Sequence, residues 1–450
     1  MTRADDREIL RLALPAFLAL VAEPLFLLAD SAIVGHLGTA PLAALGVAGA
    51  IVQTVVGLCV FLAYGTTASV ARQIGAGDVR GALHRGIDGL WLAVVIGVLV
   101  TAVTALLAGP LVRLFGADHD VAHAATTYLR IASFGITPLL LMLAATGILR
   151  GLQDTRTPMV VAVTGNLANI GLNVVLVYGA GWGIAGSAAG SLIAQCLTAA
   201  ALLVVVVRGA RRHQARLAPD LAGIRQAARA GVALVVRTLA LRAALLATTY
   251  AVTRLHAAGG HQQSVDLATH QLAYTLWSLL AFVLEALEIA AQVIVGRSLG
   301  TGDASAVRRA TARVIRWGIA TGAVAGLVLI AVGPVIGLLF TDDSAVRHEL
   351  FPVLVVIGLT EALCGVAFIL DGVLVGAGDT RYLAVSMTVA VAIYAVALVV
   401  LLQIPGANLV ALWVVLSVVF IGARAGVLLR RLRSDAWLVT GADRTGTVGA

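Results

Sequence analysis

Residues 147–156 read GILRGLQDTR, and residues 372–381 read GVLVGAGDTR. In each segment two glycines lie four positions apart and Asp-Thr-Arg follows, and the two aspartates are separated by 379 − 154 = 225 residues. GAGD at 75–78 recurs as GTGD at 300–303 with the same separation, 300 − 75 = 225. A third match at 225 residues relates Phe115 and Asp118 to Phe340 and Asp343. Three matches at one separation predict two related halves, and in the Gly-Asp loops we expect Gly to supply positive φ and Asp to cap the next helix.

The composition predicts that most of the chain lies in a membrane. Of the 450 residues, 60% are hydrophobic and 12% are charged, whereas a soluble domain of this size carries far more surface charge. Apolar runs of at least about 18 residues, long enough to cross the hydrocarbon core, recur along the whole sequence. We therefore expect an all-α integral membrane protein of about 12 transmembrane helices in two six-helix lobes. The predicted spans are 12–36, 43–71, 88–112, 125–149, 158–178, 184–207, 231–254, 266–295, 313–340, 347–375, 382–403 and 408–429.

The basic residues predict the orientation of these spans. All 31 are arginine, and they gather in alternate loops, as expected for the cytoplasmic side of a membrane protein. Both termini carry arginine, so an even number of spans places both in the cytoplasm of a bacterium, with the chain in its plasma (inner) membrane. Because each half has six spans, a pseudo-twofold axis is expected along the membrane normal. The expected domains are an N-terminal lobe (1–208), a cytoplasmic linker (209–230), a C-terminal lobe (231–430) and a disordered cytoplasmic tail (431–450).

Several function classes are excluded by the sequence. Without lysine no G-x-x-x-x-G-K-[ST] phosphate loop can form, so an ATP-driven pump is not expected. No HExxH or GxSxG motif occurs, so we expect no catalytic residue, no enzyme activity and no cofactor. The net charge of +8 follows from the loop arginines rather than from nucleic-acid binding. The expected partners are small amphipathic molecules and membrane lipid, and the expected state is a monomer.

Polar residues inside the predicted spans are costly and are therefore candidates for function. In the first half, Asp30 lies late in span 1, and Glu23 lies seven residues earlier on the same helix face. Asn166, Asn169 and Asn173 form a stripe on one face of span 5. This stripe either holds helices together or lines a cavity with Asp30, and Ser191 in span 6 could add a hydroxyl.

The second half carries more acidic residues. Glu285, Glu288 and Gln292 share one face of span 8, and Glu361 and Asp371 lie in span 10. With Glu23, these four acids are candidates for a substrate-binding or secondary cavity. His270, early in span 8, is expected at the outer boundary. A buried carboxylate can bind a proton near neutral pH and release it when exposed to water, which is the property that an ion-coupled transporter needs.

The sequence resembles the multidrug and toxic compound extrusion (MATE) family, and is most similar to its DinF-type branch. The resemblance rests on Leu14-Pro15, on Ala29-Asp30-Ser31, on Gly35-His36-Leu37-Gly38, and above all on GILRGLQDTRTP at 147–158. It implies a secondary active antiporter that exports amphipathic, often cationic organic compounds in exchange for H⁺ or Na⁺, by rocking of two lobes.

The resemblance also implies roles for single residues. Asp30 matches the essential acid of the branch, and Asn169 matches the asparagine of its Asn-x-x-x-Asp pattern in span 5. Asn173 stands where the second acid is expected, and Ser191 where a hydroxyl is usual. Asp30, Asn169 and Asn173 are therefore possible Na⁺ ligands. Because the second carboxylate is missing, proton coupling is favoured over tight Na⁺ binding.

Two alternatives remain open from the sequence. A flippase for lipid-linked oligosaccharides would need cationic residues in its cavity, for which Arg237 and Arg242 are the candidates, although Arg237 is expected near the interface. An intramembrane lipid-modifying enzyme would need a paired acidic motif with a metal, and Asp342-Asp343 is the nearest approach to one.

Overall fold

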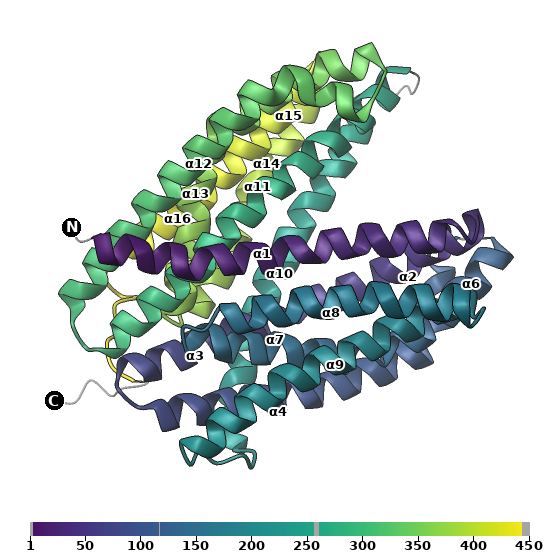
Figure 1. Cartoon of the computed structure of the whole chain (residues 1–450). Helices are drawn as coiled ribbons and strands as arrows, with labels where there is room; N and C mark the ends of the chain where they lie inside the picture. Colours follow the sequence, from purple (N-terminus) through teal and green to yellow (C-terminus); the bar gives the residue numbers. More distant parts are fainter. Residues whose placement is uncertain (1–2, 117, 256–260, 443–450) are drawn as a thin grey trace. The chain divides into compact units, whose positions relative to one another are not determined.

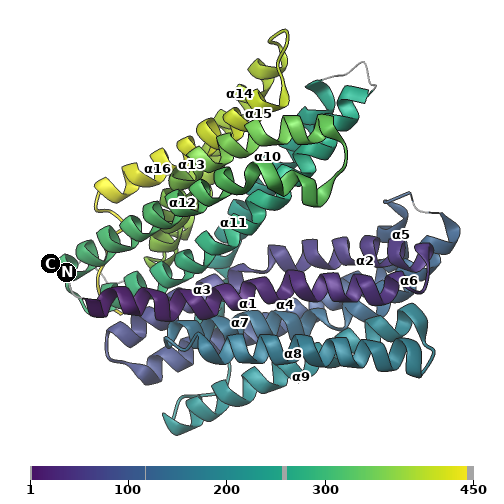
Figure 2. The same cartoon turned by 45° about the horizontal axis from the view of Figure 1, so that its top comes forward.

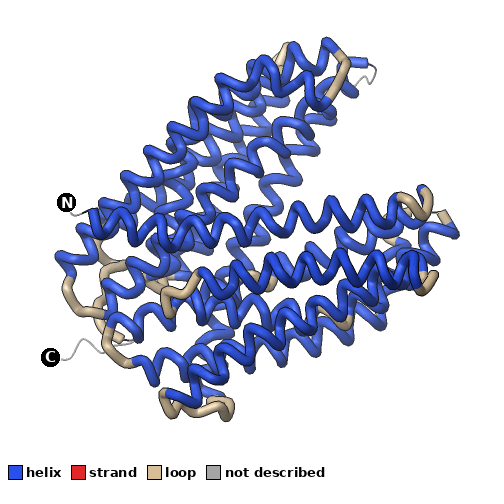
Figure 3. Tube along the Cα trace, in the orientation of Figure 1, coloured by secondary structure: helices blue, strands red, loops and turns tan. Residues whose placement is uncertain are grey.

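The computed structural model describes residues 3–116, 118–255 and 261–442. Every regular element in these ranges is a helix (Figure 3). The helices that begin in the first half of the chain are α1 (Arg3–Gly35), α2 (Thr39–Leu58), α3 (Phe61–Gly75), α4 (Val79–Leu106), α5 (Ala108–Arg113), α6 (His119–Ser133), α7 (Ile136–Gly151), α8 (Arg156–Val174), the π-helix η1 (Val175–Gly179), α9 (Gly183–Arg212) and α10 (Leu221–Leu255). Those of the second half are α11 (His261–Gly300), α12 (Ala304–Phe340), α13 (Ser344–Gly376), α14 (Thr380–Leu402), α15 (Leu409–Val414), η2 (Val415–Phe420) and α16 (Ile421–Arg433).

Within the described ranges, eleven stretches of helix are long and apolar enough to cross a membrane, and a twelfth forms if the bent pair α6 and α7 counts as one span. The two helices of that pair meet at 46°. The predicted all-α membrane fold of about 12 spans is therefore confirmed. The prediction treated 43–71 as one helix, whereas the structure divides that span into α2 and α3.

The chain forms two compact units. One contains Leu10–Gly231, and the other contains Val232–Ala450 together with Met1–Ile9 (Figures 1 and 2). Two contacts explain why the first residues of α1 group with the later half of the sequence. Glu8 forms an ion pair with Arg297 at 3.1 Å, and Asp6 accepts a hydrogen bond from the Trp317 indole at 3.0 Å. The boundary on the other side falls inside α10, between Gly231 and Val232.

The predicted linker and the predicted tail both contain ordered residues. Within the predicted linker, 209–230, α9 continues to Arg212 and α10 begins at Leu221, so only residues 213–220 lie outside helices. The first turns of α10 are amphipathic rather than apolar, which is why hydropathy did not reveal them. In the predicted tail, Trp437 is buried and donates to the carbonyl oxygen of Leu432 at 3.1 Å. The remainder of that tail, 443–450, lies outside the described residues.

The glycines that define the repeat bring helix backbones together. In the first unit, a methyl group added at Gly147 of α7 would lie 2.6 Å from the carbonyl oxygen of Ala63 in α3. One added at Gly151 would lie 2.9 Å from the carbonyl oxygen of Thr67. Contacts this short are not available to a side chain, so only glycine permits this approach of α7 to α3.

The second unit repeats the arrangement. A methyl group at Gly372 of α13 would lie 2.5 Å from the carbonyl oxygen of Glu288 in α11, and one at Gly376 would lie 2.6 Å from that of Gln292. The contacted residues keep the separation of the glycines, since 288 − 63 = 225 and 292 − 67 = 225. The repeat read from the sequence is therefore present in three dimensions, as the same close helix packing in each unit.

The Gly-Asp loops also have the predicted structural roles. Gly77 and Gly302 adopt φ values of 79° and 82°. The next residue caps the following helix in each case: the Asp78 carboxylate accepts from the Gly81 N–H, and the Asp303 carboxylate accepts from the N–H groups of Ser305 and Ala306. The Ser305 hydroxyl and these N–H groups hold the pKa of Asp303 below its usual value, because each donates to the ionised form.

The close helix packing predicts opposite effects for two glycine substitutions. Gly147→Ala is expected to lower the free energy of unfolding by about 1–3 kcal/mol, since α7 and α3 must separate to admit the methyl group. Gly171→Ala in α8, where an added methyl meets nothing within 4 Å, is expected to leave stability unchanged or raise it. Thermal unfolding of the two purified variants measures the difference, and equal melting temperatures would contradict it.

Candidate functional site

Asp30, in the last turns of α1, is a buried acid of the first unit. Asp30 is 2% exposed. The side-chain amide of Asn173, in α8, donates to Asp30 Oδ1 at 2.8 Å. The hydroxyl of Ser187, in α9, donates to the same oxygen at 2.8 Å. Three helices thus converge on one carboxylate, and both of these donors are neutral.

Hydrogen bonds along its length hold α1 beside α8. Pro15 has no N–H, so the carbonyl oxygen of Arg11 lacks its donor within the helix. The hydroxyl of Thr155, at the N-cap position of α8, donates to that oxygen at 3.2 Å. Three further hydrogen bonds follow the one from Thr155 to Arg11. The Asn166 side-chain amide donates to the Ala22 carbonyl oxygen at 3.0 Å, the Asn173 amide donates to Asp30, and the Tyr178 hydroxyl of η1 donates to the Ile33 carbonyl oxygen at 2.6 Å. The sequence separations stay at 144, 144, 143 and 145 residues, so the two helices run parallel and in register.

The asparagines of the predicted polar stripe on α8 contact different groups. Asn173 reaches Asp30, whereas Asn166 reaches the α1 backbone. Asn169 is buried one turn before Asn173. The side-chain oxygens of Asn169 and Asn173 are both buried, and neither has a hydrogen-bond partner among the described residues. This part of the site therefore holds acceptor oxygens that no donor of this unit satisfies.

The hydroxyl on Asp30 comes from Ser187, not from the predicted Ser191. Ser191 is buried one turn further along the same face of α9. Tyr128 of α6, which the sequence did not single out, lies beside both serines and close enough to Asp30 to be affected by its charge. The four-residue spacing of the serines was a usable signal for Ser187, whereas no sequence pattern marks Tyr128.

Glu23 lies outside this cluster. It is exposed on the surface of the protein and accepts a hydrogen bond of 3.4 Å from Gln53 of α2. Glu23 and Asp30 both lie in α1, but the two acids differ in burial, because Asp30 is covered by α8 and α9.

In the second unit the acids of α13 and α11 meet arginines. Asp371 is 1% exposed and accepts from Arg237 of α10 at 2.6 Å and from Arg424 of α16. Arg237 also lies 4.0 Å from Glu288. Arg237, which was expected near the interface, is buried in this ion pair, whereas Arg242 is exposed. Arg424 was not singled out from the sequence, because it stands near the arginine-rich end of the last span.

The other predicted residues of this unit are distributed over α11 and α13. Glu285 is half-buried and adds negative charge near Glu288, and Gln292 is buried against α13. Glu361 is buried beside Cys364, and none of the ion pairs between described residues includes it.

His270, expected at the outer boundary of its span, is buried within the protein. Its Nε2 lies 3.3 Å from the Thr249 hydroxyl, and its ring lies 5.6 Å from that of Trp413. Buried contacts of this kind suit a residue that packs between helices.

The family model MatE matches residues 15–175 and 239–401 of the chain. The chain belongs to the MATE family. The two matched segments begin 239 − 15 = 224 residues apart, in agreement with the internal repeat. MATE proteins are transporters and not enzymes, so this chain is a multi-pass MATE transporter, as the resemblance implied.

Relatives and solved structures cover most of this MATE transporter. It is 32% identical over 397 residues to Protein DETOXIFICATION 44, chloroplastic, of Arabidopsis thaliana, over 85% of this chain and 74% of that protein. It is 28% identical over 454 residues to DNA damage-inducible protein F of Escherichia coli (strain K12), over 96% and 94%. A crystal structure described as MATE in the bent conformation has a TM-score of 0.86 at 20% identity and covers 96% of both chains, which shows the shared fold.

The buried ion pair predicts a large loss of stability on removal of its acid. Asp371→Asn leaves Arg237 and Arg424 without their shared carboxylate, and we expect it to lower the free energy of unfolding by about 3–5 kcal/mol. The matched control is Asp435→Asn, which breaks a 2.6 Å ion pair to Arg308 that is about half exposed. Water replaces that contact, so the control should melt close to the wild-type temperature, and a similar shift in both variants would contradict the assignment.

Proposed function

We propose that this MATE transporter exports amphipathic, often cationic organic compounds in exchange for H⁺ or Na⁺, with Asp30 as the coupling group of the first unit. The observation that carries the proposal is the setting of Asp30: a buried carboxylate that, among the described residues, is held by neutral donors only, Asn173 and Ser187, on one of its two oxygens. A carboxylate without a paired cation can change its charge when it binds or releases a positive ion.

The Asp30 carboxylate can bind a proton without breaking the hydrogen bonds that hold it. The two donors meet at Oδ1, so a proton on Oδ2 leaves both hydrogen bonds in place. The ionised form attracts a cationic substrate or a second ion, and the protonated form releases it. Exposure of Asp30 to one side of the membrane and then to the other would couple the two movements.

The same residues fit Na⁺ as the alternative coupling ion. Hard cations take oxygen ligands, and the buried oxygens of Asn169 and Asn173 have no donor among the described residues. Together with Asp30 they would supply one charged and two neutral ligands, and Ser187, Ser191 or water could complete the shell. With Asn at position 173 the site carries a single negative charge, which favours H⁺ over tight Na⁺ binding.

The charges of the second unit support a cationic substrate over the flippase alternative. Asp371 pairs with Arg237, one of the two arginines expected to hold a pyrophosphate, and also with Arg424. Glu361 has no arginine partner among the described ion pairs and, with Glu285 and Glu288, gives this unit an excess of acids for a secondary cavity. A relative from Thermotoga maritima, 24% identical over 388 residues and 83% of this chain, is named a probable multidrug resistance protein, which agrees with this assignment.

We also propose the topology expected from the arginines: two six-helix lobes in a bacterial inner membrane, both termini in the cytoplasm, and a monomer as the working unit. The parallel course of α1 and α8 supports the alternation of spans, because the first and fifth spans must run in the same direction.

Flux in proteoliposomes tests the role of Asp30. Ethidium movement is followed under a pH gradient alone and under a Na⁺ gradient alone, in the wild type and in Asp30→Asn. We expect the pH gradient to drive ethidium and the variant to reduce the rate by at least about tenfold. Asp118→Asn is the matched control, since Asp118 lies outside the spans and its side chain makes no cap hydrogen bond. Wild-type flux in Asp30→Asn would refute the coupling role, and flux under a Na⁺ gradient alone would assign Na⁺.

A second acid in α8 is expected to shift the preference toward Na⁺. Asn173→Asp places two carboxylates at one site, and the added charge should increase Na⁺ affinity by about tenfold or more, because each nearby negative charge favours a bound cation. The measurement is the Na⁺ concentration that gives half-maximal ethidium flux. Asn166→Asp adds the same charge two turns earlier, and an equal shift in this control would show that the effect is not specific to the Asp30 site.

A further inference from the structure

The segment between α9 and α10, together with the first turns of α10, is hydrogen-bonded to one face of α4. Along α4, the side chains at positions 85, 88 and 91 face this segment at intervals of nearly one turn. The Arg85 guanidinium donates to the Gln226 side chain at 3.0 Å, and the Trp91 indole N–H donates to the Leu217 carbonyl oxygen at 3.0 Å. Between them, Asp88 Oδ1 accepts from the Asp220 N–H at 3.2 Å. This series sets the position of Asp220 against α4.

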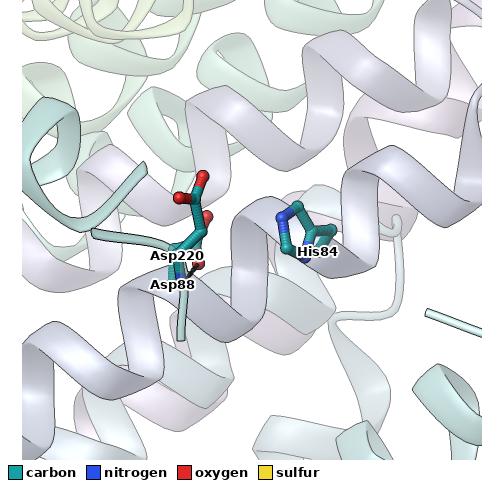
Figure 4. A group of neighbouring side chains, drawn as sticks. All are labelled: His84, Asp88 and Asp220. Atoms are coloured by element: carbon teal, nitrogen blue, oxygen red, sulfur yellow. Dashed lines mark hydrogen bonds between the residues drawn. The ribbon is translucent and has the colours of Figure 1, made fainter. Parts of the chain in front are cut away.

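Three potential metal ligands meet at the middle of this series. His84 and Asp88 lie one turn apart on the same face of α4, and Asp220 comes from the segment that covers it (Figure 4). One ligand atom from each residue lies within 4.8 Å of the other two. Two ligands of one ion, each about 2.0–2.2 Å from it, are at most about 4.4 Å apart, so a small closing movement brings all three into one coordination shell.

Two buried atoms of this group lack a hydrogen-bond partner among the described residues. Asp88 is 1% exposed, and its Oδ2 has no hydrogen-bond partner among the described residues. The Nδ1 atom of His84 is buried and has none either. An unsatisfied buried carboxylate oxygen costs several times the value of a normal hydrogen bond. A cation at this point would satisfy both atoms at once.

The surrounding charges leave the site negative. Asp220 caps α10 by accepting from the N–H groups of Ala222 and Gly223, at 3.1 and 3.2 Å, so it is held as a second carboxylate. Arg85 is the nearby cation, and its guanidinium donates to Gln226. Two carboxylates beside one imidazole are a ligand set for a divalent ion.

We propose that His84, Asp88 and Asp220 form a binding site for a divalent first-row transition metal such as Zn²⁺. Imidazole nitrogen selects such ions over Mg²⁺ and Ca²⁺, while the carboxylates supply charge. Three protein ligands leave a position for water. A bound ion would fasten the start of α10 to α4, and none of its ligands belongs to the Asp30 cluster, so the site is separate from the proposed coupling group.

Metal titration of the full-length protein in detergent tests the site. Co²⁺ is the first probe, since its visible absorption reports nitrogen and oxygen ligands, and Zn²⁺ binding is then measured by calorimetry. We expect one ion per chain, and we expect His84→Gln and Asp88→Asn each to weaken binding by at least about tenfold. Zn²⁺ should also raise the melting temperature of the wild type and not that of the variants.

The matched control is His119→Gln. His119 lies 3.5 Å from Asp120, but both side chains are fully exposed, so this pair has an imidazole and a carboxylate without the buried group. Wild-type binding in the control, with loss in His84→Gln, supports the site. The proposal is overturned if the wild type binds no stoichiometric ion, or if the control loses binding as strongly as the α4 variants. Should Asp88→Asn fail to fold, His84→Gln decides alone.

Discussion

The carbonyl oxygen of Arg11 has no donor within its own helix because Pro15 lacks an N–H, and Thr155 supplies one from α8. This contact illustrates the constraint on which the rest of the structure depends: inside a bilayer, polar groups must find their partners within the protein. The constraint explains why every described element is helical. It also explains why Asp30 lies between Asn173 and Ser187, and why Asp371 lies between two arginines.

The two units share a packing scheme but not a chemistry. Gly147 and Gly372 bring the same pairs of helices together, and the contacted residues differ by the same 225 positions as the glycines. Asp371 and Asp30, which lie inside the spans, do not follow the repeat. The position equivalent to Asp371 is Thr146, since 371 − 225 = 146, and the position equivalent to Asp30 is Leu255, since 30 + 225 = 255. Backbone packing was kept in both units because any larger residue separates the helices, whereas each unit acquired its own buried charges.

The neighbours of Asp30 and Asp371 suit different roles. Asp371 is held by Arg237 and Arg424, and a carboxylate in such a pair stays ionised because loss of its charge would leave the arginines buried and alone. Asp30 has only neutral donors, so a change in its charge leaves no partner unsatisfied. In the proposed mechanism, structure and coupling therefore depend on different acids in different units.

The sequence by itself determined the membrane fold, the number of spans, the repeat and the choice of Asp30 and Asn173, because hydropathy, glycine spacing and a charge in an apolar run are local signals. It did not determine Ser187 as the hydroxyl on Asp30, Tyr128 as its neighbour, the burial of Arg237 with Asp371, or the meeting of Asp88 with Asp220. Each of these pairs joins helices far apart in the chain. Helical periodicity fixes which residues share a face, but only tertiary packing decides which face of another helix lies opposite, and therefore which charges are paired and which are left to bind an ion.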